Sequence, residues 1–291
     1  MANPKIIVTG ANGQLGRELS RLAQQFPAFD IVPLSREQLP IHQFESVRNY
    51  FDAVRPAYCI NCAAYTAVDK AEKEQEQAML VNAESVSVLA AVCRLYNTRF
   101  IHISTDYVFD GTANTPYKED SKVNPVNFYG LTKLKGEALC LLQNSDSIII
   151  RTSWVYSEFG ANFVKTMLRL MKERDTLGVV NDQVGSPTYA GDLAETILTI
   201  VANSEQQAAN WTAGIYHYSN EGVISWYDFA VAIRNLSAST CVVNPIPTSA
   251  YPTPAKRPAY SVFSKEKIKQ QFGITIPAWE TSLQQCIKRL L

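Results

Sequence analysis

The chain has 291 residues, of which 46% are hydrophobic and 19% charged, an ordinary composition for a globular protein. Its 27 basic residues balance 27 acidic ones, which argues against a nucleic-acid-binding surface, because such a surface needs a concentrated positive field. We recognise no signal peptide and no apolar run that could span a bilayer. We therefore expect a cytoplasmic protein with neither nucleic-acid nor membrane partners.

The first half of the chain alternates strand-like apolar runs with helical patterns. This alternation predicts an α/β fold, a doubly wound parallel (Rossmann) sheet with helices on both faces. The expected strands are Lys5–Thr9, Ile31–Leu34, Tyr58–Ala63, Arg99–Ser104 and Ser147–Arg151. The longest expected helix between them runs from about Gln77 to Leu95.

After Arg151 the regular alternation of strand-like and helical patterns becomes weaker. We expect helices near 162–172, 192–201, 226–236 and 281–291, with short strands at 177–180 and 215–218. Prolines crowd residues 245–258, which predicts an extended loop there. We therefore divide the chain into a dinucleotide-binding domain, 1–152, and a smaller α/β substrate lobe, 153–291, that returns some segments to the main sheet.

A glycine-rich loop follows the first strand. Gly10, Gly13 and Gly16 stand at the strand-to-helix junction, where glycines allow a tight turn, close approach to a pyrophosphate and close helix packing. The helix N-terminus then offers oriented N–H groups to phosphate. No Gly-Lys-Ser/Thr follows, so we predict a dinucleotide site rather than a nucleotide-hydrolysing loop.

After the second strand the chain carries Ser35 and Arg36, where an NAD site usually places an acidic residue. A hydroxyl and a guanidinium suit the 2′-phosphate of NADP. We favour NADPH as the cofactor and leave NADH open.

Three polar residues indicate the chemistry. Tyr129 and Lys133 lie four residues apart on an expected helix and so share one face, where the ammonium would lower the pKa of the phenol. Thr105 follows the fourth strand at the carboxyl edge of the sheet, where ligands gather in such folds. With a hydride carrier, this trio would reduce a carbonyl or oxidise an alcohol.

At these residues the chain resembles the extended short-chain dehydrogenase/reductase superfamily and, more closely, its dTDP-4-dehydrorhamnose reductase family. The similar segments are 61–72, 104–111, 151–156, 181–188 and 251–258. The resemblance implies NADPH-dependent reduction of the C4 keto group of dTDP-4-dehydro-L-rhamnose to dTDP-L-rhamnose, a polysaccharide precursor.

The resemblance also implies roles for residues. Tyr129 would donate the proton, Lys133 would hold the nicotinamide ribose, and Thr105 would hydrogen-bond the sugar carbonyl. The expected cofactor contacts are Gly10, Gly13, Gln14, Leu15, Gly16, Ser35, Arg36, Ala63, Ala64, Tyr65, Thr66, Tyr129 and Lys133. The expected substrate contacts are Thr105, Asp106, Trp154 and Arg257, although Trp154 suits a core equally well and Arg257 a surface.

Two features depart from the family pattern. Pro40 stands where many relatives carry an Asp, which removes one expected contact to the adenosine half of the cofactor. Glu18 is the only candidate we find for a family Mg²⁺ site, so we expect no metal. His42, His102 and His217 lack metal-ligand spacing, and the Cys59–Cys62 pair suits buried thiols.

Alternatives remain open. The scaffold also serves sugar-nucleotide dehydratases and epimerases, but Tyr107 follows Asp106 where dehydratases carry a glutamate. A non-catalytic regulatory subunit resembling the methionine adenosyltransferase β subunit is a second alternative, against which the intact trio argues. The sequence leaves open the nucleotide and the oligomeric state, including a homodimer.

Overall fold

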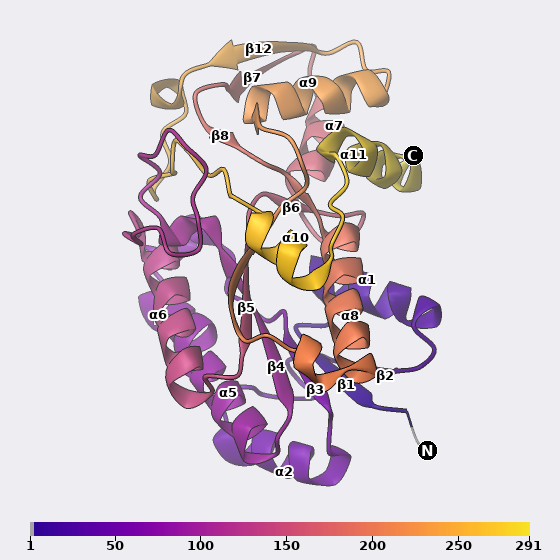
Figure 1. The fold of residues 1–291 in the computed structure, drawn as a ribbon. Helices are drawn as coiled ribbons and strands as arrows, with labels where there is room; N and C mark the ends of the chain where they lie inside the picture. The colour runs from indigo at the N-terminus through magenta and orange to yellow at the C-terminus, as the bar shows by residue number, and fades with distance from the viewer. Residues whose placement is uncertain (1–2) are drawn as a thin grey trace.

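The computed structural model describes residues 3–291 and is built around a six-stranded parallel sheet (Figure 1). The strand order is β10-β5-β4-β3-β1-β2, and every neighbouring pair is parallel. The predicted doubly wound sheet is thus confirmed. Its strands are β1 (Lys5–Thr9), β2 (Asp30–Leu34), β3 (Tyr58–Asn61), β4 (Arg99–Thr105), β5 (Ile148–Thr152) and β10 (Gly214–Tyr218).

Helices cover both faces of this sheet because both faces of its strands are apolar. Along β1, Ile6 and Val8 pack toward α1 (Gln14–Leu22) and α8 (Ala190–Gln206), whereas Ile7 packs into the opposite core. Successive side chains of a strand point to opposite faces, so a continuous apolar run feeds two cores. The opposite core contains α2 (Phe44–Val54), α5 (Ser85–Leu95) and part of α6 (Phe128–Gln143).

The long helix expected from about Gln77 is divided. It consists of α4 (Gln75–Met79), a π-helical segment (Leu80–Glu84) and α5. As one stretch, Gln75–Leu95 is by length and composition alone apolar enough to cross a membrane, so our statement that no such run exists was wrong. Half of it is buried, and α5 packs on α2, α6 and β4. The fold therefore uses it as a covering layer of the sheet.

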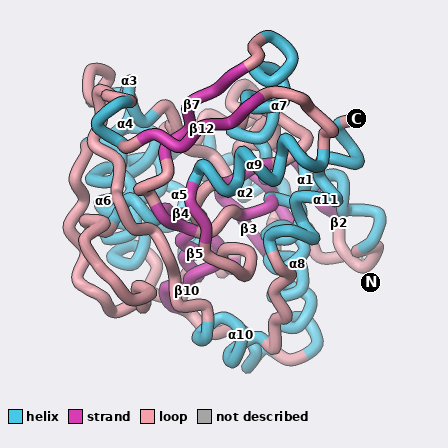
Figure 2. Tube along the Cα trace, turned by 90° about the horizontal axis from the view of Figure 1, so that it is seen from above, coloured by secondary structure: helices cyan, strands magenta, loops and turns pink. Residues whose placement is uncertain are grey.

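The chain after β5 builds a second group of elements and also returns to the sheet. Strand β10 adds to the sheet edge beside β5, and α8 packs on α1. The small sheets pair β7 (Thr176–Val180) with β12 (Val242–Ile246), β8 (Val184–Gly185) with β11 (Ile224–Ser225), and β6 (Val155–Tyr156) with β9 (Thr188–Tyr189). The remaining helices are α3 (Val68–Ala71), α7 (Phe163–Glu173), α9 (Trp226–Leu236), α10 (Glu266–Phe272) and α11 (Trp279–Leu290). Figure 2 shows β7 and β12 side by side, next to α9.

One prediction about the proline-rich stretch was wrong. Pro245 lies inside β12, opposite Val179 of β7, rather than in a loop. A proline has no N–H and is tolerated in an edge strand, where that position need not pair. Strand β12 belongs to a two-stranded sheet, so it is such an edge.

Candidate active site

The glycine loop joins β1 to α1 in a geometry that requires glycine. Gly10 has a φ of +70°, and a Cβ there would lie 2.5 Å from the backbone nitrogen of Ala63. A Cβ on Gly16 would lie 2.5 Å from the carbonyl oxygen of Gly10. Gly13 stands at the N-cap of α1 without a side chain to occupy the helix N–H groups. The helix N-terminus is therefore left open to an anion.

A cavity of about 570 Å³ opens beside this loop. It brings together seven of the predicted cofactor residues, namely Gly10, Gly13, Ser35, Arg36, Ala63, Ala64 and Tyr65. Three others lie elsewhere: Leu15 is in the hydrophobic core, Gly16 packs on the loop, and Gln14 hydrogen-bonds Asn162 and Val155. Thr66 is exposed and outside the cavity lining. The glycine cradle and a nearby guanidinium fit a dinucleotide phosphate.

Sequence analysis missed most of the wall opposite the glycine loop. Most of these residues come from the loop after β2 and from residues 74–85, and Cys62 follows β3. The only local signal was the apolar Leu39 and Ile41 after a strand. Glu37 also lies there, and its hydrogen bond with Ser35 lowers the pKa of its carboxyl group. Outside the glycine loop, the missed lining residues are Glu37, Leu39, Ile41, His42, Cys62, Glu74, Gln77, Leu80, Val81 and Ser85, and within it they are Thr9, Ala11 and Asn12.

Thr105 and Asp106 form a hydrogen-bonded pair at the carboxyl end of β4. The Thr105 hydroxyl donates to Oδ1 of Asp106 at 3.0 Å and accepts from the Tyr107 N–H at 3.3 Å. Oδ2 of Asp106 is buried and has no partner among residues 3–291. Burial raises the pKa of Asp106 from 3.8 to about 6. A buried oxygen in need of a donor, beside a hydroxyl, suits a polar ligand.

Close backbone packing brings Tyr129 beside this pair. The Asn127 side chain caps α6 by accepting from the Gly130 N–H at 2.8 Å. A Cβ on Gly130 would lie 2.2 Å from the Tyr107 carbonyl oxygen, so only glycine lets α6 approach the turn after β4. The rings of Tyr107 and Tyr129 meet edge to face at 5.5 Å. The close approach of α6 to the turn after β4 therefore places Tyr129 next to Thr105, as predicted.

The predicted effect of Lys133 on the phenol was wrong. Burial raises the pKa of Tyr129 to about 12, and the lowering contribution comes from hydrogen bonding with Thr105 instead. The Lys133 ammonium lies elsewhere: it is 2% exposed, and its Nζ donates to the Ile103 carbonyl oxygen at 2.7 Å. Burial lowers the pKa of Lys133 to about 8. Helical spacing put the two residues on one face but did not fix where the flexible lysine ends.

Asn82, on the π-helical segment, holds the cavity wall to the catalytic helix. Its side chain exchanges hydrogen bonds with the backbone N–H and carbonyl of Tyr65, at 2.8 and 3.0 Å. It also donates to the Thr132 hydroxyl at 3.0 Å. A Cβ on Gly136 would lie 2.1 Å from the Asn82 carbonyl oxygen, so the two helices pack closely. Sequence analysis missed this residue, which carries no local signal.

Trp154 follows β5 and has a left-handed backbone, with a φ of +49°. Its indole stacks on Trp226 at 3.6 Å and covers Gly185, where a Cβ would lie 2.7 Å from the ring. A tryptophan in this conformation is strained, and such strain persists only where neighbours hold it. The half-buried ring is thus fixed in place by the C-terminal elements.

Arg257 lies near the start of α6. Its Nη2 pairs with Asp69 at 2.8 Å, whereas its buried Nη1 has no partner in the described residues. It also lines a second cavity of about 500 Å³. The adjacent Lys256 carbonyl accepts from Asn127, so this segment is tied to the cap of the catalytic helix.

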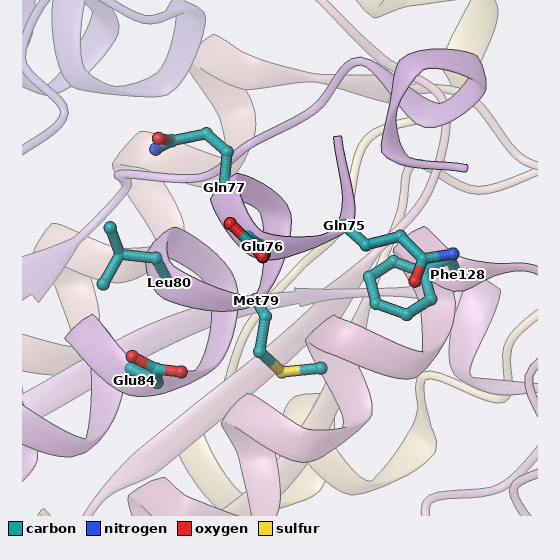
Figure 3. A pocket seen from close by; sticks show the side chains of 7 residues that line it. All are labelled: Gln75, Glu76, Gln77, Met79, Leu80, Glu84 and Phe128. Carbon is teal, nitrogen blue, oxygen red and sulfur yellow. The ribbon is translucent and has the colours of Figure 1, made fainter. Parts of the chain in front are cut away.

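A third cavity, of about 610 Å³, is lined by residues of α4, of the π-helical segment and by Phe128 (Figure 3). Its lining shares Gln77 and Leu80 with the first cavity but contains none of the predicted site residues. Figure 3 shows glutamine and glutamate side chains there around Met79 and Phe128. We assign it no part in the chemistry.

Glu18, the candidate metal ligand, is buried and pairs with Arg21 at 2.8 Å and with the Ser157 hydroxyl at 2.6 Å. Within residues 3–291 no group of three or more His, Cys, Asp or Glu side chains is arranged to hold a metal. Five of the six unpaired cysteines are buried, as expected for thiols in a core, and Cys62 is half-buried at the cavity.

Comparison with known proteins supports one family. A family model described as RmlD substrate binding domain matches residues 4–291. The chain is 43% identical over 288 residues to a dTDP-4-dehydrorhamnose reductase of Aggregatibacter actinomycetemcomitans, covering 96% of this chain and 97% of that one.

Two solved structures have the same fold throughout. A dTDP-4-dehydrorhamnose reductase of Clostridium acetobutylicum superposes with a TM-score of 0.93 at 40% identity, covering 98% of this chain and 99% of that one. One of Bacillus anthracis, solved in complex with NADP, also gives 0.93, at 37% identity, covering 99% of this chain and all of that one.

Proposed function

The chain belongs to the RmlD substrate-binding-domain family of dTDP-4-dehydrorhamnose reductases, and we propose that it reduces the C4 keto group of dTDP-4-dehydro-L-rhamnose to give dTDP-L-rhamnose. The observation that carries the proposal is the contact between Thr105 and Tyr129 at the carboxyl end of β4. The glycine loop after β1 lies at the same edge of the parallel sheet. The reaction supplies a precursor for rhamnose-containing polysaccharides.

NADPH supplies the hydride when it is bound. Tyr129 donates the proton to the carbonyl oxygen as negative charge develops on it, and the high pKa of this phenol keeps it protonated for that purpose at neutral pH. The Thr105 oxygen accepts from the Tyr107 N–H, and its single proton, which it donates to Asp106 in the free protein, would turn to the carbonyl oxygen and orient it. General acid catalysis of this kind contributes about 10²–10⁴-fold in rate, and orientation contributes further.

We propose a division of labour between 1–152, which holds the cofactor, and the lobe 153–291, which holds the sugar nucleotide together with Asp106. Trp154 would pack on the sugar with its fixed indole face. Arg257 would offer its unpaired Nη1 to the diphosphate, because a guanidinium binds phosphate oxygens strongly. Gln14, Leu15, Gly16 and Thr66 would support the cofactor site rather than line it.

We propose NADPH over NADH because Ser35 and the exposed Arg36 line the adenosine end of the cavity. The adjacent carboxylate of Glu37 acts in the other direction and favours NADH, because a carboxylate suits an unphosphorylated ribose. We also propose a cytoplasmic location, which suits six unpaired thiols. A homodimer stays a proposal.

The test is NADPH oxidation, followed by absorbance, with dTDP-4-dehydro-L-rhamnose as substrate. UDP-linked and 4-keto-D-gluco analogues, and NADH in place of NADPH, serve as comparisons. We expect turnover with the dTDP-L-sugar and NADPH, and slower turnover with the others. Tight NADPH binding without turnover on any keto-sugar nucleotide would instead favour a non-catalytic subunit.

A further inference from the structure

A buried chain of hydrogen bonds runs from the glycine loop to Lys133 under the sheet edge. The Thr9 hydroxyl donates to Oδ1 of Asn61 at 2.6 Å. Nδ2 of Asn61 lies 3.0 Å from Nδ1 of His102, and Nε2 of His102 lies 3.5 Å from Nζ of Lys133. Asn61 and His102 are fully buried, and Thr9 and Lys133 nearly so. Neighbouring strands β1, β3 and β4 supply the first three residues.

The orientation of the Asn61 amide is fixed by a backbone group. The Ala63 N–H lies 3.2 Å from Oδ1 of Asn61, and a backbone N–H can only donate. Oδ1 therefore faces Ala63 and Thr9, and the amide nitrogen must face His102. Because that nitrogen donates, Nδ1 of His102 accepts and carries no proton.

The tautomer of His102 follows. Burial and the nearby Lys133 hold the pKa of His102 well below its usual range, so the ring is neutral and has one N–H. With Nδ1 as the acceptor, that proton is on Nε2 and points toward Nζ of Lys133. If Lys133 were an ammonium, its N–H groups would face the Nε2–H of His102, donor against donor. As a neutral amine, Lys133 accepts a hydrogen bond from Nε2–H with its lone pair. The amine still donates to the Ile103 carbonyl.

We propose that His102 is a positioning residue, locked by Asn61 as the Nε2–H tautomer, that hydrogen-bonds the lone pair of Lys133 and so favours the neutral amine over the ammonium. This inference rests on the proposed function only in that Lys133 would then hold the nicotinamide ribose beside the reacting carbonyl. Its consequence is that Lys133 can take up or release a proton on Nζ near neutral pH, to which burial, by lowering the pKa of the amine to about 8, also contributes.

Other ionisable groups face Lys133 and act in the opposite direction. Glu137 on α6, Cys140 on α6 and Cys62 after β3 each favour the ammonium. Glu137 is held in turn by Arg151, with Nη2 to Oε2 at 2.7 Å. None of these contacts involves His102, so changing the imidazole leaves them in place.

The first experiment measures the histidine tautomer in the free, unsubstituted protein by nitrogen-15 NMR of the ring. We expect the proton of His102 on Nε2. A proton on Nδ1 would overturn the proposal. This measurement requires no substrate, so its failure is distinct from failure of the proposed function.

The second experiment titrates the Cε signal of Lys133 by carbon-13 NMR, assigned by its loss in Lys133→Arg. We expect a midpoint near pH 8 in the original protein. His102→Phe removes the Nε2–H and should raise the midpoint by about one pH unit, a tenfold change in the protonation constant. Asn61→Asp keeps an acceptor for Ala63 but faces Nδ1 with a carboxylate, so it should move the ring proton to Nδ1 and raise the midpoint as well.

The matched control is Ile101→Val, which disturbs the buried part of the same strand without touching the chain of hydrogen bonds. It should leave the midpoint unchanged. An unchanged midpoint in His102→Phe would overturn the proposal, as would an equal shift in Ile101→Val. Should His102→Phe not fold, the tautomer of the original protein and of Asn61→Asp still decides the question.

Discussion

The cavity beside the glycine loop, which we propose as the adenosine end of the site, is lined by loop backbone and by exposed side chains such as Arg36. Around Thr105 and Lys133, the proposed reacting end, the polar groups are buried and bonded to other protein groups. A buried polar group that loses its partner retains the full cost of desolvation, but an exposed one returns to water. We therefore expect substitutions at the reacting end to have large effects and those at the adenosine end to have small ones.

The largest effect should come from Tyr129→Phe. Removing the phenol hydroxyl removes the proton donor, so turnover should fall by about 10²–10⁴-fold. NADPH binding, measured by fluorescence titration, should change little because the glycine cradle is untouched. Near-normal turnover in this variant would mean that another group supplies the proton.

Glu137→Gln should be the most destabilising change beneath the site. Glu137 and Arg151 are each 3% exposed and share two hydrogen bonds, so the variant leaves a guanidinium buried without its counterion. Breaking such a pair typically costs about 3–5 kcal/mol, measured here by urea unfolding. The exposed pair Arg169–Glu173 is the control, and Glu173→Gln should cost about 1 kcal/mol or less. Equal losses would refute the contrast.

Asp106→Asn should change how stability depends on pH. Between pH 3.8 and about 6 the folded protein holds a proton on Asp106 that the unfolded chain releases, so stability falls as pH rises through this window. A shift of about two units corresponds to about 3 kcal/mol. Relative to the original protein, Asp106→Asn should therefore be more stable by up to about 3 kcal/mol at pH 7 and by none of this amount near pH 3. A pH-independent difference would show that Asp106 does not titrate there.

Arg36→Ala should have the smallest effect. The guanidinium is exposed, and its loss should weaken NADPH binding by about tenfold, or about 1.4 kcal/mol. NADH binding should be unchanged, because the difference between the two cofactors is the 2′-phosphate. Equal weakening of both would place Arg36 outside the phosphate site.

The contrast also explains what sequence could predict. Gly10, Thr105 and the Tyr129–Lys133 spacing were found because strand, turn and helix signals place them locally. The strand order and the partners of Lys133 could not be predicted, because Asn61, His102 and Lys133 meet only after two strands and a helix assemble. Likewise, no local pattern indicated the role of Asn82, because it depends on how the π-helical segment packs. No local pattern predicted that Pro245 lies in a strand, because that depends on the edge position of the strand.

The most direct measurement of the central claim is the fate of the hydride. The purified protein would be given NADPH carrying deuterium at the transferable C4 position together with dTDP-4-dehydro-L-rhamnose, and the product examined by proton NMR. The account predicts a single deuterium at C4 of a sugar with the L-rhamno configuration. Deuterium at another carbon, or a product without deuterium, would contradict it.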